Sequence, residues 1–253
     1  MADVTEDQDA VVDLLGSTRA VLFDFDGPIC DLFGAASTAH VADRVKQEAR
    51  REWKGLDPSV ETCDDSHGIL RVLREMYDGC SPAPTDLPLR LAEKIVAEFE
   101  SLAGVTAKKA PHVVPLVDLL LELGIRLVIV SNNAESPIQE YLEEHGMKSK
   151  FEMISGRDPY NANLMKPHPH CVERALDHLS LPPSSCLLIG DQLTDLTAAQ
   201  KAGTLFLGYT QNEVRAKEMK HNGANAVVSS HLALITAARE LLARRRASAA
   251  PAR

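Results

Sequence analysis

Short apolar runs alternate with longer segments of helical periodicity along most of this 253-residue chain. The runs have the length of buried strands, and a glycine follows most of the helical segments between them. Repeated strand–helix units predict a parallel sheet with helices on both faces, a Rossmann-like, doubly wound α/β fold. The predicted strands cover residues 20–25, 126–131, 151–155, 186–190, 204–208 and 225–228.

One long stretch interrupts this alternation. About a hundred residues separate the first two predicted strands, and their pattern predicts helices and no strand. Since an ordinary strand–helix connection is far shorter, we expect an inserted α-helical cap domain that is a candidate lid. We therefore expect a core domain of residues 18–33 and 112–242, a cap of residues 34–111, and a disordered tail of residues 243–253.

The first predicted strand ends in two aspartates, Asp24 and Asp26. Alternate side chains of an extended segment lie on the same face, so both carboxylates can leave the strand in one direction. Two carboxylates this close repel each other unless a cation lies between them or one keeps its proton. Acidic residues are also common in solvated turns, so this pair alone does not decide between a turn and a metal site.

Polar residues follow three later strands of the predicted sheet. Ser131 and Asn132 follow the second strand, Lys166 precedes a Pro-x-Pro segment, and Asp191 and Asp195 follow the strand at 186–190. The carboxyl ends of strands in a doubly wound sheet converge on one crevice. Carboxylates, a hydroxyl, an amide and an ammonium gathered there suit phosphoryl transfer.

Each of these later residues also has a simpler interpretation. Asp191 and Asp195 suit the acidic first turn of a helix, and Lys166 alone would be a solvated surface lysine. His168 and His170 resemble a metal-binding pair, but a zinc site needs further ligands nearby, so we interpret them as turn and helix-start residues. The order of all the motifs along one chain favours the functional interpretation.

The four motifs in this order, from about residue 20 to residue 228, resemble those of the haloacid dehalogenase superfamily. Members similar to phosphoglycolate phosphatase have a helical cap after the first strand. The resemblance implies that Asp24 is the nucleophile that forms an aspartyl-phosphate. It also implies that Asp26 protonates the leaving oxygen and then activates water. Asp26 disfavours a dehalogenase, because a departing halide needs no proton.

The resemblance implies roles for the other motifs as well. Ser131, Asn132 and Lys166, with the backbone near Gly27, are expected to bind the phosphoryl group. Lys166 is also expected to hold the nucleophile. These roles make all of them candidate substrate-binding residues.

The expected cofactor is Mg²⁺, which prefers oxygen ligands. The resemblance implies that Asp24, Asp191, Asp195 and the backbone carbonyl of Asp26 bind it. Independently of the family, a phosphate dianion is repelled by a carboxylate, so Mg²⁺ and Lys166 must offset that charge. We therefore predict a Mg²⁺-dependent phosphatase that acts on a small phosphorylated metabolite.

Three other functions remain open from the sequence. A phosphosugar mutase uses the same two aspartates and returns the phosphoryl group to a sugar. A signalling receiver module also manages a phospho-aspartate, but it has no helical insert, and a purely phosphometabolite-binding protein has little need for Asp26. Pro28 and Leu32 depart from the usual first motif of the family, so substrate specificity cannot be transferred.

Composition limits the classes of partner and the cellular compartment that we expect for this protein. A net charge of -9 and a pI near 5.5 argue against nucleic acids and anionic membranes as partners. No apolar run approaches the ~20 residues of a membrane span. Five cysteines without a Cys-x-x-Cys pair suit a reducing compartment. We expect a cytoplasmic monomer or homodimer whose partner is a small-molecule phosphate ester.

Overall fold

The computed structural model describes residues 8–34 and 36–249 of the chain. The sheet contains β1 (Ala20–Phe23), β4 (Arg126–Val130), β5 (Met153–Ser155), β6 (Cys186–Gly190), β7 (Leu205–Tyr209) and β8 (Ala226–Val228). All neighbours pair in parallel, in the order β5-β4-β1-β6-β7-β8. Numbered among themselves, these strands follow the doubly wound order 3-2-1-4-5-6. The predicted fold class is confirmed, and each predicted strand overlaps an observed one.

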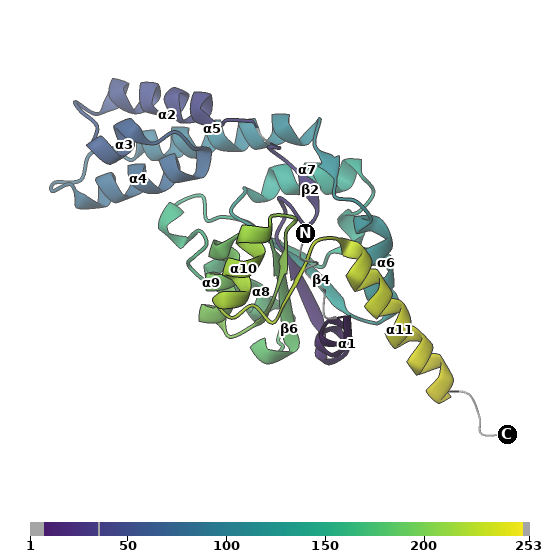
Figure 1. The fold of residues 1–253 in the computed structure, drawn as a ribbon. Helices are drawn as coiled ribbons and strands as arrows, with labels where there is room; N and C mark the ends of the chain where they lie inside the picture. The colour runs from purple at the N-terminus through teal and green to yellow at the C-terminus, as the bar shows by residue number, and fades with distance from the viewer. Residues whose placement is uncertain (1–7, 35, 250–253) are drawn as a thin grey trace.

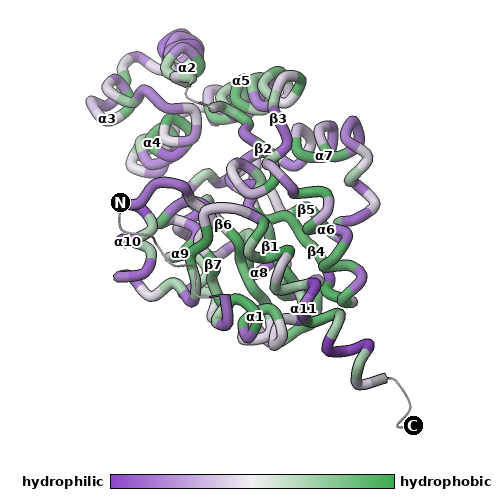
Figure 2. Tube along the Cα trace, turned by 45° about the vertical axis from the view of Figure 1, so that its right-hand side comes forward, coloured by the Kyte–Doolittle hydropathy of each residue, from purple (hydrophilic) through white to green (hydrophobic). Residues whose placement is uncertain are grey.

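Alternation along the buried strands divides the hydrophobic core into two halves. Val21 and Phe23 of β1 face one half, whereas Ala20 and Leu22 face the other. The first half is covered by α1 (Gln8–Ser17), α6 (Val113–Glu122), α7 (Glu135–Glu144) and α11 (His231–Ala249). The second half is covered by α8 (His170–Leu179), α9 (Leu193–Ala202) and α10 (Glu213–His221). Figure 2 shows the resulting hydrophobic centre along the strands.

Four of the helices between β1 and β4 form a separate layer, drawn at the upper left of Figure 1. They are α2 (Ala39–Glu52), α3 (Pro58–Thr62), α4 (Ser66–Gly79) and α5 (Leu87–Gly104). Their apolar residues form a third hydrophobic cluster, which includes Trp53. Met165, from the loop between β5 and α8, also packs into this cluster. The helical layer is therefore in direct contact with the loop that carries Lys166.

Two short strands at the base of the helical layer contradict the expectation of helices alone. β2 (Cys30–Asp31) pairs antiparallel with β3 (Lys108–Lys109). The pairing brings together the chain segments that enter and leave the layer. Each strand is only two residues long, and β3 is exposed, so neither has an apolar period that a sequence pattern could detect.

The expectation of a disordered tail from residue 243 is wrong for residues 243–249, where α11 continues to Ala249. Arg245 donates a hydrogen bond to the carbonyl of Leu123 at 2.7 Å, and Arg246 pairs with Glu122 at 2.8 Å. These polar contacts attach the end of α11 to the end of α6. The segment they order has no apolar periodicity, so the sequence pattern does not predict a helix there. Residues 250–253 lie outside the described residues.

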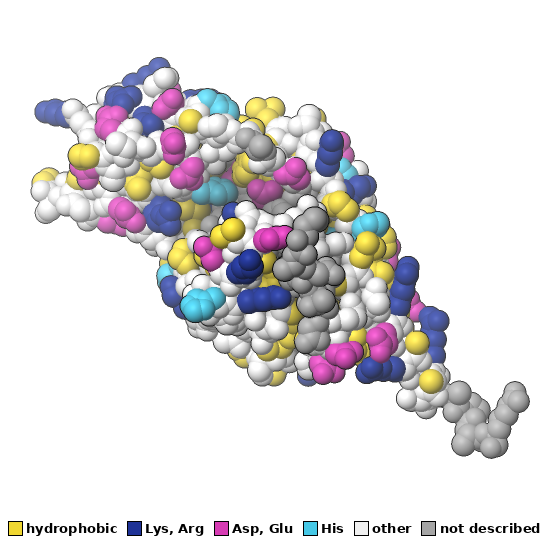
Figure 3. Space-filling model, in the orientation of Figure 1, with side chains coloured by type: hydrophobic (Ala, Val, Ile, Leu, Met, Phe, Trp, Pro, Cys, Tyr) yellow, Lys and Arg dark blue, Asp and Glu magenta, His cyan; other side chains and the backbone are white. Residues whose placement is uncertain are grey.

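Within the described part of the chain, no helix has the length and hydropathy of a membrane span. On the face shown in Figure 3, described acidic and basic side chains are interspersed. All five cysteines are free thiols.

Candidate active site

A buried lysine and a buried aspartate form the floor of a pocket at the carboxyl ends of the central strands. Asp24 directly follows β1, and its backbone N–H donates to the carbonyl of Ile189 in β6 at 2.9 Å. Lys166 Nζ lies 2.8 Å from Asp24 Oδ1 and 2.6 Å from Asp195 Oδ1. It also donates to the carbonyl of Val130 at 3.3 Å. Lys166 is therefore held from three sides and aimed at Asp24.

Three carboxylates meet beside this lysine. Asp24, Asp191 and Asp195 each offer one oxygen, and these oxygens all lie within 4.8 Å of one another. Asp195 also completes the first turn of α9, because its Oδ2 accepts a hydrogen bond from the N–H of Gln192 at 3.0 Å. The helix-start interpretation of Asp195 and the functional one are thus compatible, since its two oxygens have different partners.

The loop after β4 is locked to the loop that carries Lys166. The N–H of Lys166 donates to Asn132 Oδ1 at 2.7 Å, and Asn132 Nδ2 donates back to the carbonyl of Lys166 at 3.3 Å. Ser131 Oγ donates to Asn133 Oδ1 at 3.0 Å and accepts from the N–H of Asn133 at 3.1 Å. Ser131 and Asn132 line the same pocket as Lys166.

Asp26 and Gly27 shape the turn after β1. Asp26 Oδ1 accepts a hydrogen bond from the N–H of Leu32 at 2.8 Å, so Leu32 serves through its backbone despite departing from the usual motif. Gly27 has a φ of +99°, and a Cβ placed there would lie 2.9 Å from Asp191 Cγ. Only glycine allows the turn to approach Asp191 this closely without strain.

The electrostatics of the pocket favour an added cation. Burial raises the pKa of Asp24 well above its usual value, and Asp195 and Asp191 raise it further while Lys166 opposes them. Burial, Asp195 and Asp26 raise the pKa of Asp191 to about 7. Burial also raises the pKa of Asp26, which favours its acid form. Although burial opposes its charge, Lys166 has a raised pKa because Asp195 and Asp24 lie beside it.

These carboxylates fit a Mg²⁺ ion. A partly buried group of oxygen donors with excess negative charge is what this hard ion prefers. The group consists of Asp24, Asp191 and Asp195, whereas the side chain of Asp26 bonds to Leu32. His168 and His170 are outside the group, and His170 begins α8, with its N–H donating to His168 Nδ1 at 3.2 Å.

The pocket has a volume of about 270 Å³, and all of the predicted site residues except Gly27 line it. Gly27 contributes through its close approach to Asp191. Phe33 and His67 also line the pocket, although they lie far from the motifs in the sequence. His67 lies in the first turn of α4, where no motif of the sequence marks it. Gln192 and Thr194 also line the pocket. Because they lie between Asp191 and Asp195 in the sequence, that motif could have indicated them as pocket residues.

Comparison with known proteins identifies the class to which this fold and site belong. A family model for haloacid dehalogenase-like hydrolases matches residues 18–203. The phosphoglycolate phosphatase of Neisseria gonorrhoeae is 28% identical over 197 residues, which cover 76% of this chain and 80% of the relative. That of Thiobacillus denitrificans is 26% identical over 217 residues, which cover 84% of this chain and 92% of the relative.

Solved structures share the fold. CbbY from Rhodobacter sphaeroides, determined in complex with phosphate, matches with a TM-score of 0.56 and 20% identity, covering 84% of this chain and 94% of that one. A haloacid dehalogenase-like family protein from Streptococcus pneumoniae matches with a TM-score of 0.54 and 17% identity, covering 91% and 99%. This chain therefore belongs to the haloacid dehalogenase-like hydrolases, and the prediction of a phosphohydrolase of this family is confirmed.

Proposed function

We propose that this protein is a Mg²⁺-dependent phosphatase that hydrolyses a small phosphate monoester through an aspartyl-phosphate on Asp24. One observation carries the proposal: Lys166 Nζ contacts both Asp24 and Asp195 beside the three-carboxylate group, at the floor of one pocket. A nucleophile, a cation and a metal-binding group are the parts that phosphoryl transfer to a carboxylate needs.

In the first step, an oxygen of Asp24 attacks phosphorus while the bond from phosphorus to the ester oxygen breaks. Lys166 favours the ionised form of Asp24 and orients it, and with Ser131 and Asn132 it binds the phosphoryl oxygens. Asp26 transfers its proton to the departing alkoxide, so a neutral alcohol leaves. Its raised pKa suits it to hold that proton near neutral pH.

In the second step, the ionised Asp26 removes a proton from water as the water oxygen attacks phosphorus. The bond between Asp24 and phosphorus breaks, which restores the carboxylate and releases inorganic phosphate. Asp24, Asp191, Asp195 and the carbonyl of Asp26 are the groups that would hold Mg²⁺. When bound, this ion would lower the charge barrier between Asp24 and the phosphate dianion.

The names of the relatives suggest 2-phosphoglycolate as the first compound to test. A screen of phosphorylated metabolites, with Mg²⁺ and with chelator, should detect inorganic phosphate only with Mg²⁺. Asp24→Asn should lower the rate by roughly 10³-fold or more. Hydrolysis that survives either the chelator or this substitution would contradict the mechanism.

The role of Asp26 needs a test of its own because the acid matters only for poor leaving groups. Asp26→Asn should slow alkyl phosphates by ~10²- to 10⁴-fold. It should slow p-nitrophenyl phosphate much less, since nitrophenolate leaves without a proton. Equal losses on both substrates would refute a general acid. A mutase would instead yield an isomeric phosphate without stoichiometric release of inorganic phosphate.

A further inference from the structure

A chain of buried polar contacts runs behind the pocket and ends at His67. Among the described residues that line the pocket, the segment between β2 and α5 supplies Phe33 and His67 and no lysine or arginine. The backbone of His67 is fixed at the start of α4, where Asp65 Oδ1 accepts from the N–H groups of His67 at 3.1 Å and Gly68 at 2.6 Å. The imidazole ring lies edge-on to Phe33, with 6.1 Å between ring centres.

Glu100 of α5 holds the imidazole from behind. Its Oε1 lies 3.0 Å from His67 Nε2, and its Oε2 accepts from the N–H of Ala134 at 2.9 Å. Burial opposes the charge of Glu100, but Arg157 and His67 lower its pKa, so it is ionised and can only accept. His67 Nε2 therefore carries the hydrogen of this contact, and Nδ1 is the ring nitrogen available to a ligand.

Arg157, from the loop after β5, holds Glu100 in turn. Its side chain is fully buried and pairs with Glu100 and, at 2.7 Å, with Glu93. Its Nη1 also donates to the carbonyl of Asn132 at 3.0 Å. A buried ion pair is weak evidence for stability, because desolvation offsets much of the attraction. Its place between a catalytic loop and the ring of His67 therefore favours a positioning role.

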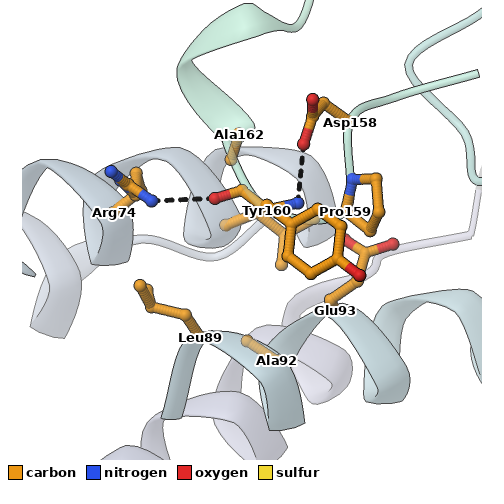
Figure 4. Close-up of a pocket in the computed structure, with 9 residues that line it drawn as sticks. Arg74, Leu89, Ala92, Glu93, Asp158, Pro159, Tyr160 and Ala162 are labelled. Carbon is orange, nitrogen blue, oxygen red and sulfur yellow. Dashed lines mark hydrogen bonds between the residues drawn. The ribbon is translucent and has the colours of Figure 1, made fainter. Parts of the chain in front are cut away.

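The same loop is attached to the helical layer at a second point. Figure 4 shows Arg74 of α4 donating to the carbonyl of Tyr160, at 2.8 Å, while Tyr160 N–H bonds to Asp158. Glu93 of α5 lies under this turn. The loop therefore contacts both α4 and α5, which are the helices that carry His67 and Glu100.

The leaving group of a substrate has to extend toward His67. The phosphoryl group must lie against Asp24 and Lys166 at the floor, and Asp26 must reach the ester oxygen. Asp26 and His67 line this same pocket, and Phe33 and His67 are the lining residues supplied by the segment between β2 and α5. The atoms beyond the ester oxygen then meet the wall formed by Phe33 and His67.

The geometry points to His67 as the residue that binds the remote polar group of the substrate, with Glu100 and Arg157 as the residues that position its ring. This inference rests on the proposed phosphatase function and narrows its substrate class. A volume of about 270 Å³ is at the small end for ligand pockets. The described residues of the wall supply one imidazole and no lysine or arginine, so the site suits a two- or three-carbon ester bearing one carboxylate or hydroxyl. It does not suit a bisphosphate.

Three matched esters test this inference: ethyl phosphate, 2-hydroxyethyl phosphate and 2-phosphoglycolate. They differ only in the group attached to the carbon that bears the ester oxygen. This group is a methyl, a hydroxymethyl or a carboxylate, respectively. The wild-type enzyme should prefer one of the two polar esters, and the preferred one identifies whether Nδ1 accepts or donates. His67→Asn should raise KM for that ester by about ten- to a hundredfold, the loss expected for a hydrogen bond to a charged or buried group.

Two further measurements separate binding at the wall from general damage. His67→Asn should lower kcat/KM for the preferred polar ester by about tenfold or more beyond its effect on ethyl phosphate and on competitive inhibition by inorganic phosphate, since these two ligands have no group that reaches the wall. His40→Asn is the matched control, because His40 packs against Phe99 in the same layer and does not line the pocket. An equal loss on ethyl phosphate and on the preferred polar ester would overturn the inference.

Glu100→Gln tests the positioning role, and Glu98→Gln, at an exposed site on the same helix, is its control. Glu100→Gln should show the same substrate-selective rise in KM as His67→Asn. Because glutamine can still accept a hydrogen bond from His67, this variant should retain more preference for the polar ester than Glu100→Ala does. A Glu100→Gln enzyme that keeps full preference for the polar ester would overturn the positioning role. If wild type hydrolyses none of the esters, the proposed function fails instead, so the two failures are distinguishable.

Discussion

Replacing Lys166 with methionine should make the stability of the protein depend on pH in a defined direction. Methionine keeps the unbranched shape of the side chain, one atom shorter, and removes the ammonium that lies between Asp24 and Asp195. The facing oxygens lie within 4.8 Å, so two charges repel by about 3.5 kcal/mol at an effective dielectric constant of 20. Removing one partner from a buried ion pair costs about 3–5 kcal/mol, which agrees with this repulsion.

The pH dependence follows from how the carboxylates respond. Lys166 lowers the pKa of Asp24, which burial raises, so without the ammonium the pKa of Asp24 in the folded variant rises further above the unfolded value of about 3.9. A carboxylate with a raised folded pKa contributes stability at low pH and loses it as pH rises through that pKa. Lys166→Met should therefore cost about 3–5 kcal/mol at pH 8 and clearly less at pH 5, where one carboxylate takes a proton.

Urea unfolding monitored by circular dichroism at pH 5 and pH 8, in chelator, measures both values. Lys201→Met is the matched control, because this exposed lysine bonds only to the carbonyl of Pro167 among the described contacts. Added Mg²⁺ should stabilise wild type by about 2.7 kcal/mol at a hundred times its Kd. A loss from Lys166→Met that is the same at both pH values would refute the electrostatic account.

Two other predictions concern a turn and a buried histidine. Gly27→Ala should weaken Mg²⁺ binding, measured by calorimetry, because the new Cβ displaces Asp191 and a left-handed φ costs about 1–2 kcal/mol; unchanged affinity would contradict the close approach. Burial lowers the pKa of His231 from 6.5 to about 4, so wild type loses stability as the pH falls through this range and the unfolded histidine takes up a proton first. About 3 kcal/mol of that loss should disappear in His231→Phe, measured by urea unfolding at pH 7 and pH 4, and an identical pH profile for both proteins would exclude His231 as its source.

The strands and the motif loops could be predicted because their signals are local. Apolar runs mark the strands, and a parallel sheet necessarily brings the residues after them to one edge. Asp24, Lys166 and Asp191 meet for that reason, although they lie far apart in the chain. The small sheet at Cys30 and Lys109 gave no such signal, since its strands are too short for a period.

The wall of the pocket could not be predicted because it depends on tertiary contacts between distant segments. His67, Glu100 and Arg157 belong to two helices of the insert and a loop of the core. Each one alone has the appearance of an ordinary surface charge. Only folding reveals that the side chains of Glu100 and Arg157 are fully buried and connected to the pocket. Similarly, α11 extends through an Arg-rich segment because side chains bond to α6, which no periodicity encodes.

Asn132 connects the wall of the pocket to its floor. Its carbonyl accepts a hydrogen bond from Arg157, and its side chain makes two hydrogen bonds with the backbone of Lys166. Arg157 in turn pairs with Glu93 and Glu100 on α5. A displacement of α5 must therefore either break a buried ion pair or move the loop that aims Lys166 at the nucleophile. The helical layer and the catalytic lysine are coupled in this way through Arg157 and Asn132.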